Sequence, residues 1–145
     1  MSRRILSTSL LAASALAVAT TGPGAAAPPV SHDRATGHTL AFTAKHTGIV
    51  PTGRRDYVLT DDIVQHGQQV GADVLSCRTR GTLAHCTVSL ALGDGQMHLR
   101  ITLHESGDLR GKVTGGDGRY AGAVGRVRGH AASEKAERVV VRWHS

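Results

Sequence analysis

A run of five glycines within residues 114–127, TGGDGRYAGAVGRV, has the residue types that most directly suggest ligand chemistry. Residues 116–121 match the dinucleotide-binding pattern G-x-G-x-x-A, with Glu137 in the place of its ribose-binding acid. That chemistry requires a helix whose N-terminus faces the pyrophosphate. Residues 122–129 are rich in glycine and favour no helix, and the sequence contains no Gly-Lys-Ser or Gly-Lys-Thr. We therefore predict a tight turn, in which glycines adopt positive φ angles and let neighbouring backbones approach.

Nine histidines are the next candidates, because imidazole binds metals and transfers protons near neutral pH. His98 and His104 fall on one face of a predicted strand, but they lie roughly 20 Å apart along it. No histidine spacing matches a zinc motif. No local pattern supports a serine or cysteine nucleophile. The sequence therefore predicts surface histidines, no metal site and no cofactor.

The two cysteines, Cys77 and Cys86, flank a predicted hairpin. With Gly81 and Thr82 as a two-residue loop of type II′, residue 77 pairs with residue 86. Cysteines directly opposite at a non-hydrogen-bonded position have Cα atoms about 4.5 to 5.5 Å apart, which allows a disulfide worth roughly 2 to 3 kcal/mol. The alternative is a pair of free thiols, one of them reactive.

The elements that must position these residues alternate apolar and polar side chains with a period of two. In residues 96–104, for example, Met97, Leu99, Ile101 and Leu103 share one face. Eight such segments are predicted, at about residues 38–47, 55–65, 71–79, 83–92, 96–104, 109–114, 122–131 and 136–144. Short connections imply antiparallel neighbours, so we predict an all-β fold, a single eight-stranded antiparallel (up-and-down) β-barrel with one disulfide-linked hairpin. A sandwich of two sheets shows the same alternation and is the alternative.

The N-terminal segment has the features of a secretory signal peptide over residues 1–26. Arg3 and Arg4 precede an apolar run that is shorter than the ~20 residues of a membrane anchor, which is the alternative. Residues 27–37 are predicted to be a disordered leader, and residues 38–145 a secreted barrel domain.

Charge and aromatic content limit the partners. Removing Arg3 and Arg4 lowers the formal charge from +6 to +4. Four aromatic residues are too few for the stacking platform of single-strand nucleic-acid binders. We therefore predict no nucleic-acid partner and no membrane span.

Three segments contain recognisable signatures: GKVTGGDGRYAGAVGRVRG at 111–129, LTDDIVQHGQQVGADVLSC at 59–77 and HCTVSLALGDGQMHL at 85–99. In this order of strands, turns and glycines, residues 57–143 resemble the allene oxide cyclase and dirigent barrel superfamily. The resemblance implies an eight-stranded antiparallel barrel with an apolar central cavity. It also implies a homo-oligomer, and a function among cofactor-free isomerases, cyclases and proteins that steer radical coupling.

The resemblance also implies site residues. Asp61 falls where the cyclases hold a water with an Asn, and Cys77 matches the cysteine that lines their pocket. We predict Asp61 and Tyr120 as catalytic residues, since a buried carboxyl group there would serve as an acid or base. A small apolar molecule in the barrel is predicted to contact Phe42, Tyr57, Leu99, Ile101 and Trp143. The alternative is that Asp61 and Asp62 form a solvated pair at a strand bend.

Two positions depart from the superfamily pattern. The first strand has Thr43, Ala44 and Lys45 where the cyclases and dirigent proteins usually have an acidic residue. The dirigent Ala-Arg-Gly after the glycine turn is residues 123–125, Ala-Val-Gly, so that catalytic arginine is missing. Both departures weigh against allene oxide cyclase activity itself.

Three functional hypotheses follow. The first is a secreted, small-molecule-handling barrel that catalyses isomerisation or cyclisation without a cofactor. The second is a passive binder of a small apolar ligand. The third is a disulfide-stapled surface interaction module with a filled lumen and salt-sensitive binding to an acidic surface. Its basic outer face would consist of Arg100, Arg110, Lys112, Arg126, Arg128, Arg138 and Arg142.

Overall fold

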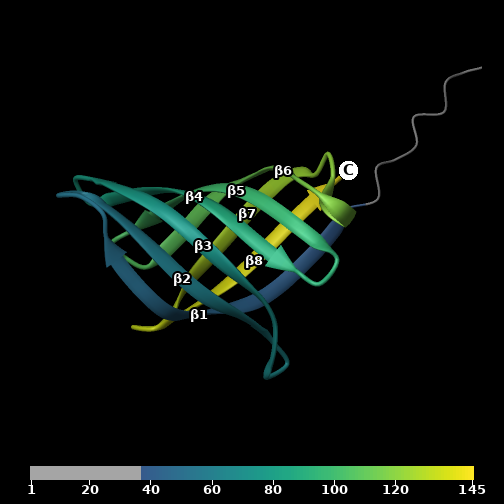
Figure 1. Cartoon of the computed structure of the whole chain (residues 1–145), viewed down its shortest axis with the longest axis horizontal. Helices are drawn as coiled ribbons and strands as arrows, with labels where there is room; N and C mark the ends of the chain where they lie inside the picture. Colours follow the sequence, from purple (N-terminus) through teal and green to yellow (C-terminus); the bar gives the residue numbers. More distant parts are fainter. Residues whose placement is uncertain (1–36) are drawn as a thin grey trace, which may run out of the picture. The chain divides into compact units, whose positions relative to one another are not determined.

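Eight strands follow one another in the computed structural model, which describes residues 37–145 (Figure 1). The predicted signal peptide over 1–26 and residues 27–36 of the predicted leader lie outside the described residues. The strands are β1 (His38–Pro51), β2 (Asp56–Gln65), β3 (Gln68–Arg80), β4 (Leu83–Leu92), β5 (Gly95–His104), β6 (Asp108–Gly116), β7 (Val124–Ser133) and β8 (Ala136–His144). One 3-10 helix, η1 (Gly118–Tyr120), lies between β6 and β7.

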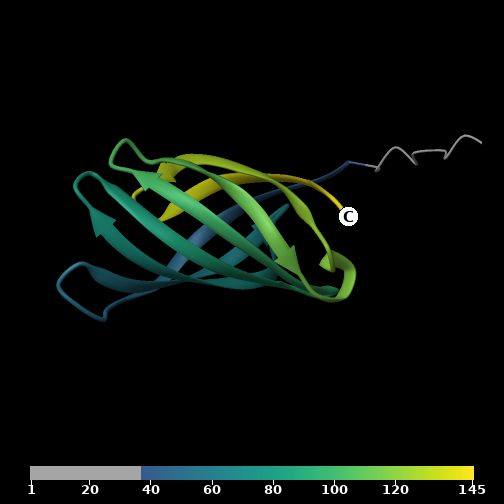
Figure 2. The same cartoon turned by 90° about the horizontal axis from the view of Figure 1, so that it is seen from above.

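The sheet closes on itself because β1 pairs with both β2 and β8. Every neighbouring pair is antiparallel, and the strands follow chain order around the barrel. The predicted up-and-down barrel is therefore confirmed, and the two-sheet sandwich is wrong. Figure 2 shows the β1–β2 hairpin at the end of the barrel opposite the C-terminus. Among residues 37–145, no helix is long and apolar enough to span a bilayer.

The strand boundaries differ from the prediction most at the end of β1, which continues to Pro51 rather than residue 47 because its last residues stay paired with β2. They also differ at two turns. β3 begins at Gln68 rather than residue 71, because His66 and Gly67 have φ angles of 49° and 81°. Two left-handed residues make a tight turn that keeps the strands paired up to the hairpin. β7 begins at Val124 rather than residue 122, because the chain first makes the short turn of η1.

The glycine run is a corner, as predicted. Gly115, Gly118 and Gly122 have φ angles of 142°, 55° and 73°. Gly125 lies against β8, where an added Cβ would be 2.7 Å from the Cα of Trp143 and closer still to the Arg142 carbonyl oxygen. No α-helix follows the run, so the residues lack the element on which a dinucleotide pyrophosphate would bind.

The inward face of each strand forms one apolar core. Met97, Leu99 and Ile101 are buried as predicted, and Leu103 packs against the core. The other buried hydrophobic residues are Phe42, Ala44, Ile63, Leu75, Cys77, Cys86, Val88, Leu90, Leu109, Val113, Tyr120, Ala123, Val127, Val139, Val141 and Trp143.

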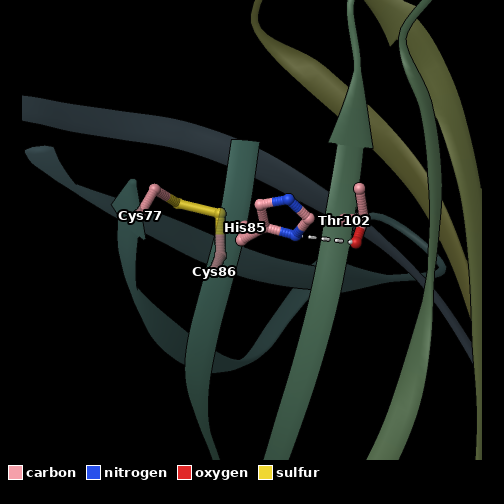
Figure 3. The surroundings of a disulfide bond; sticks show 4 residues. All are labelled: Cys77, His85, Cys86 and Thr102. Atoms are coloured by element: carbon pink, nitrogen blue, oxygen red, sulfur yellow. Dashed lines mark hydrogen bonds between the residues drawn. A yellow bond between two sulfur atoms is a disulfide. The ribbon is translucent and has the colours of Figure 1, made fainter. Parts of the chain in front are cut away.

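Cys77 and Cys86 form the predicted disulfide across β3 and β4 (Figure 3). The hairpin turn is at Gly81, with a φ angle of 60°, and the two cysteine Cα atoms are 4.1 Å apart. Both cysteines are buried in the core. The hypothesis of free thiols is therefore wrong, and neither sulfur is available for thiol chemistry.

We expect Gly125→Ala to lower the free energy of unfolding by about 1 to 3 kcal/mol, because the new Cβ must push β7 and β8 apart. Gly93→Ala is the control, since an added Cβ there meets no atom within 4 Å. Urea denaturation of the two variants and the wild type measures the difference. An equal loss of unfolding free energy in both variants would contradict the close approach of β7 and β8 at Gly125.

Reduction of the disulfide is expected to lower the free energy of unfolding by about 2 to 3 kcal/mol, because it releases the short loop in the unfolded chain. Urea curves with and without dithiothreitol measure this loss. The double variant Cys77→Ala/Cys86→Ala is the control and should not respond to the reductant. A response of the double variant would assign the effect to another cause.

Candidate functional site

A group of polar side chains interrupts the apolar lumen. His46, Asp61 and Asp73 face each other in register across three neighbouring strands, β1, β2 and β3. Each occupies an inward position of its strand, so side-chain alternation directs all three toward the barrel interior. Glu137 joins them from β8, where it pairs with Ala44 of β1. We call these four residues the interior cluster.

His46 and Asp61 are directly bonded. Nδ1 of His46 and Oδ1 of Asp61 are hydrogen-bonded at 2.8 Å, and the Asp61 side chain is 2% exposed. The His46 side chain is 25% exposed, so the imidazole lies between the buried carboxyl group and solvent. Burial and a direct partner show that Asp61 is not part of a solvated pair at a strand bend.

Asp73 has a buried oxygen with unused hydrogen-bonding capacity. Its Oδ1 is buried and has no hydrogen-bond partner among residues 37–145. Burial raises the pKa of Asp73 to about 8, with further contributions from the nearby charges of Asp61 and Glu137. Asp73 is therefore mostly protonated at neutral pH, and a protonated carboxyl group donates a hydrogen bond.

Glu137 has a related environment. Burial raises its pKa, His46 opposes this shift, and Asp61 adds to it. The pKa of Tyr57 is also raised, by burial and by the charge of Glu137. Carboxyl groups in one weakly solvated space repel each other when ionised, and this repulsion helps Asp73 to keep its proton near neutral pH.

The carboxyl groups surround a small cavity of about 20 Å³. Asp61, Asp73 and Glu137 line it together with the predicted contacts Phe42, Leu99 and Ile101. A volume of this size accommodates roughly one water molecule. An organic ligand can therefore reach the cluster only if side chains at the end of the barrel shift.

Two of the predicted site residues lie elsewhere. Trp143 pairs with His38 at the start of β1, whereas Asp61 pairs with His46, eight residues further along that strand. Eight residues of strand span about 26 Å. Tyr120 lies beside Trp143, with ring centroids 5.7 Å apart. The structure therefore does not bring Tyr120 and Asp61 into one site.

Tyr120 has a structural environment of its own. Its hydroxyl donates to Oδ1 of Asp94 over 2.8 Å, and Arg119 binds the other oxygen of that carboxylate over 3.0 Å. Burial and the hydrogen bond to Asp94 raise the pKa of Tyr120 to about 12. These contacts hold η1 against the β4–β5 turn and cover that end of the barrel.

Sequence reasoning missed His46, Asp73 and Glu137. The signal that would have found them is strand parity, because each has the same parity as buried apolar residues of its own strand. Glu137 also provides a carboxyl group close to where the first strand lacks the acidic residue that is usual in the superfamily. It lies opposite Ala44, so β8 supplies a carboxyl group beside β1. Within the described barrel, no three His, Cys, Asp or Glu side chains are grouped so that they could hold a metal.

No family model matches the sequence, and no curated protein matches it. Solved structures do match. Pyocyanin demethylase aligns with a TM-score of 0.63 and 20% identity, over 73% of this chain and 99% of that chain. The pterocarpan synthase dirigent proteins PsPTS1 and GePTS1 both align with a TM-score of 0.57, at 15% and 16% identity. These alignments cover 75% and 83% of this chain and 95% and 96% of theirs.

The protein thus has the barrel fold of the dirigent proteins and of pyocyanin demethylase. The predicted resemblance to the allene oxide cyclase and dirigent barrel superfamily is confirmed for the fold. At these identities, the likeness establishes the architecture only.

The protonation of Asp73 should make stability depend on pH. Because its folded-state pKa of about 8 is above the ordinary value of 3.8, the folded protein binds a proton that the unfolded chain releases. Its contribution to stability therefore falls as pH rises from about 4 to 8, by at most about 1.4 kcal/mol per pH unit.

Urea denaturation across this pH range measures the free energy of unfolding. The Asp73→Asn variant should lack the decrease that Asp73 causes between about pH 4 and 8. Asp62→Asn is the control, since Asp62 on the neighbouring strand bonds the exposed Gln69 instead of facing the cavity. If the free energy of unfolding changes with pH in the same way in the wild type and in Asp73→Asn, Asp73 is not protonated in the folded protein.

Proposed function

We propose that this protein is a secreted, cofactor-free isomerase or cyclase that transfers protons on a small apolar molecule. The observation that supports this most is the pairing of two kinds of group around one cavity. Asp73 is a protonated carboxylic acid at neutral pH, and the His46–Asp61 pair can accept a proton. An acid and a base in one enclosed space are what a proton shift between two carbons of a substrate requires.

The proposed reaction conserves atoms and electrons. The His46–Asp61 pair removes a proton from one carbon of the substrate, and Asp73 donates its proton to another position. Glu137, also at the cavity, returns a proton to Asp73 from the pair. The product is an isomer of the substrate, and no oxidant or reductant is consumed.

The lining of the cavity supports an apolar substrate. Phe42, Leu99 and Ile101 surround the carboxyl groups and exclude water, which keeps Asp73 protonated. Substrate would enter at the end where His46 is partly exposed and where Tyr57 and Leu59 are half-buried. Entry requires side chains there to move, because the cavity is smaller than such a molecule.

Two further observations support the proposal. A demethylase of pyocyanin and two pterocarpan synthases have this barrel fold, so the architecture is compatible with small-molecule chemistry. The buried disulfide suits an oxidising compartment, in agreement with the predicted signal peptide.

Native mass spectrometry of the protein purified from culture medium tests for a retained small molecule. The released molecule is then incubated with the protein in D2O, where proton transfer to carbon is expected to add deuterium. We expect Asp61→Asn and Asp73→Asn to slow deuterium uptake by about 100-fold or more while binding persists. Asp62→Asn should retain the wild-type rate.

The outcomes separate the hypotheses. Retention without deuterium uptake would make the barrel a passive binder. Loss of uptake in Tyr120→Phe, with Asp73→Asn still active, would move the chemistry to the other end of the barrel. A protein that retains no molecule and binds none from a library of apolar enones and phenols would contradict the proposal.

A further inference from the structure

The outer face of the barrel has a row of cationic side chains that crosses four strands. Arg100 of β5 pairs with Lys112 of β6, Lys112 with Arg126 of β7, and Arg126 with Arg142 of β8. All four are exposed. Neighbouring strands lie about 4.8 Å apart, so the row extends over about 14 Å with one cation per strand. We call these four residues the basic row.

More cations lie directly beside the basic row. Arg110 and Arg128 face each other two residues further along β6 and β7, which is about 7 Å from the row. Arg138 follows on β8, opposite His130. Together with the basic row, these residues give seven Lys and Arg side chains on the outer face of β5–β8.

Few anions lie near this face, and none within the described barrel forms an ion pair with its cations. Asp108 lines a hollow with Arg128 and Arg138, and Asp56 lines one with Arg100 and Lys112. The acidic residues of β5–β8 are Asp108, at the start of β6, and Glu137, which points inward. The ion pairs among residues 37–145 involve Asp56, Asp61 and Asp94, and none includes any of these seven cations.

Such an arrangement destabilises the sheet, because like charges directly opposite on neighbouring strands repel each other. An external polyanion would remove the repulsion and release counterions from itself, which favours binding. Open hollows offer room for it. One of about 680 Å³ includes Arg100 and Lys112, and one of about 670 Å³ includes Arg126, Arg128 and Arg142.

The shape and chemistry of the face distinguish between classes of polyanion. Phe42 and Tyr120 are buried and Tyr57 is half-buried, and Trp143 lines one of the hollows but is only 7% exposed, so bases of a nucleic acid have little aromatic surface to stack on. The barrel surface curves from β5 to β8 (Figure 2), so a planar membrane cannot contact the whole row at once. A flexible chain can follow it.

We propose that the outer face of β5–β8 binds a linear anionic polysaccharide along the basic row. This function goes beyond the proposed isomerase activity and uses none of the residues of the interior cluster. The third sequence-based hypothesis, an interaction module with a filled lumen, agrees with it, because the interior cavity is only about 20 Å³.

Titration calorimetry with heparin, a sulfated polysaccharide, tests the proposal on the full secreted protein. We expect Arg126→Gln/Arg142→Gln to weaken heparin binding at least about tenfold. The matched control is Arg54→Gln/Arg80→Gln, which removes the same charge from exposed residues outside the face and should change the affinity less than about twofold. Arg100→Gln/Lys112→Gln removes the other half of the row and should reproduce the loss.

Folding and the interior chemistry are controlled separately. Because repulsion is relieved, the row variants should have urea midpoints no lower than the wild type. Asp73→Asn should bind heparin as the wild type does. A failure of deuterium uptake therefore does not affect this proposal, and a failure of heparin binding does not affect the isomerase proposal.

Four outcomes would overturn the proposal. The first two are that heparin does not bind, or that the row and control variants lose heparin affinity equally. The other two are that heparin affinity does not change between about 50 and 300 mM salt, or that another polyanion binds more tightly than heparin. The competing polyanions are single-stranded DNA and vesicles containing about 30% phosphatidylserine, compared at equal charge concentration. Tighter binding to either would assign the face to that partner instead.

Discussion

The pairing of β1 with both β2 and β8 is the constraint on which the other properties depend. It leaves the sheet without an open edge, so the inward side chains of all eight strands must share one enclosed volume. Apolar residues such as Phe42 and Leu99 fill most of that volume. The same closure buries Asp61 and Asp73, which in an open sheet would be solvated. The stability of the core and the chemistry of the interior cluster therefore have one origin.

Enclosure has opposite effects on stability and on function. A filled lumen gives close packing, and it keeps Asp73 protonated by removing water. It also leaves a cavity of about 20 Å³, which is too small for an organic substrate. Catalysis in this barrel would therefore depend on movement at the end near His46. The more the interior is optimised for packing, the more free energy substrate binding must supply to open it.

The two faces of each strand are used independently. On β8, Arg138 and Arg142 point outward, while Val139, Val141 and Trp143 alternate with them and point into the core. The register that closes the core therefore also sets the spacing of the cations outside. Core packing fixes this register, because a shift by one residue would bury the arginines and expose the valines. The basic row is held in place by the interior.

The sequence by itself determined most local features of the fold. The period of two located the strands, the turn at Gly81 placed Cys77 opposite Cys86, and the absence of helix-forming residues after Ala121 excluded a nucleotide site. All of these depend on residues close together in the chain. Asp61 came from the resemblance to a known superfamily. The environment of Asp61 was decided by the tertiary structure alone, because His46, Asp73 and Glu137 come from strands whose register is set by closure of the whole barrel. For the same reason, only the structure could separate Tyr120 from Asp61, since their distance depends on which end of β1 each one faces.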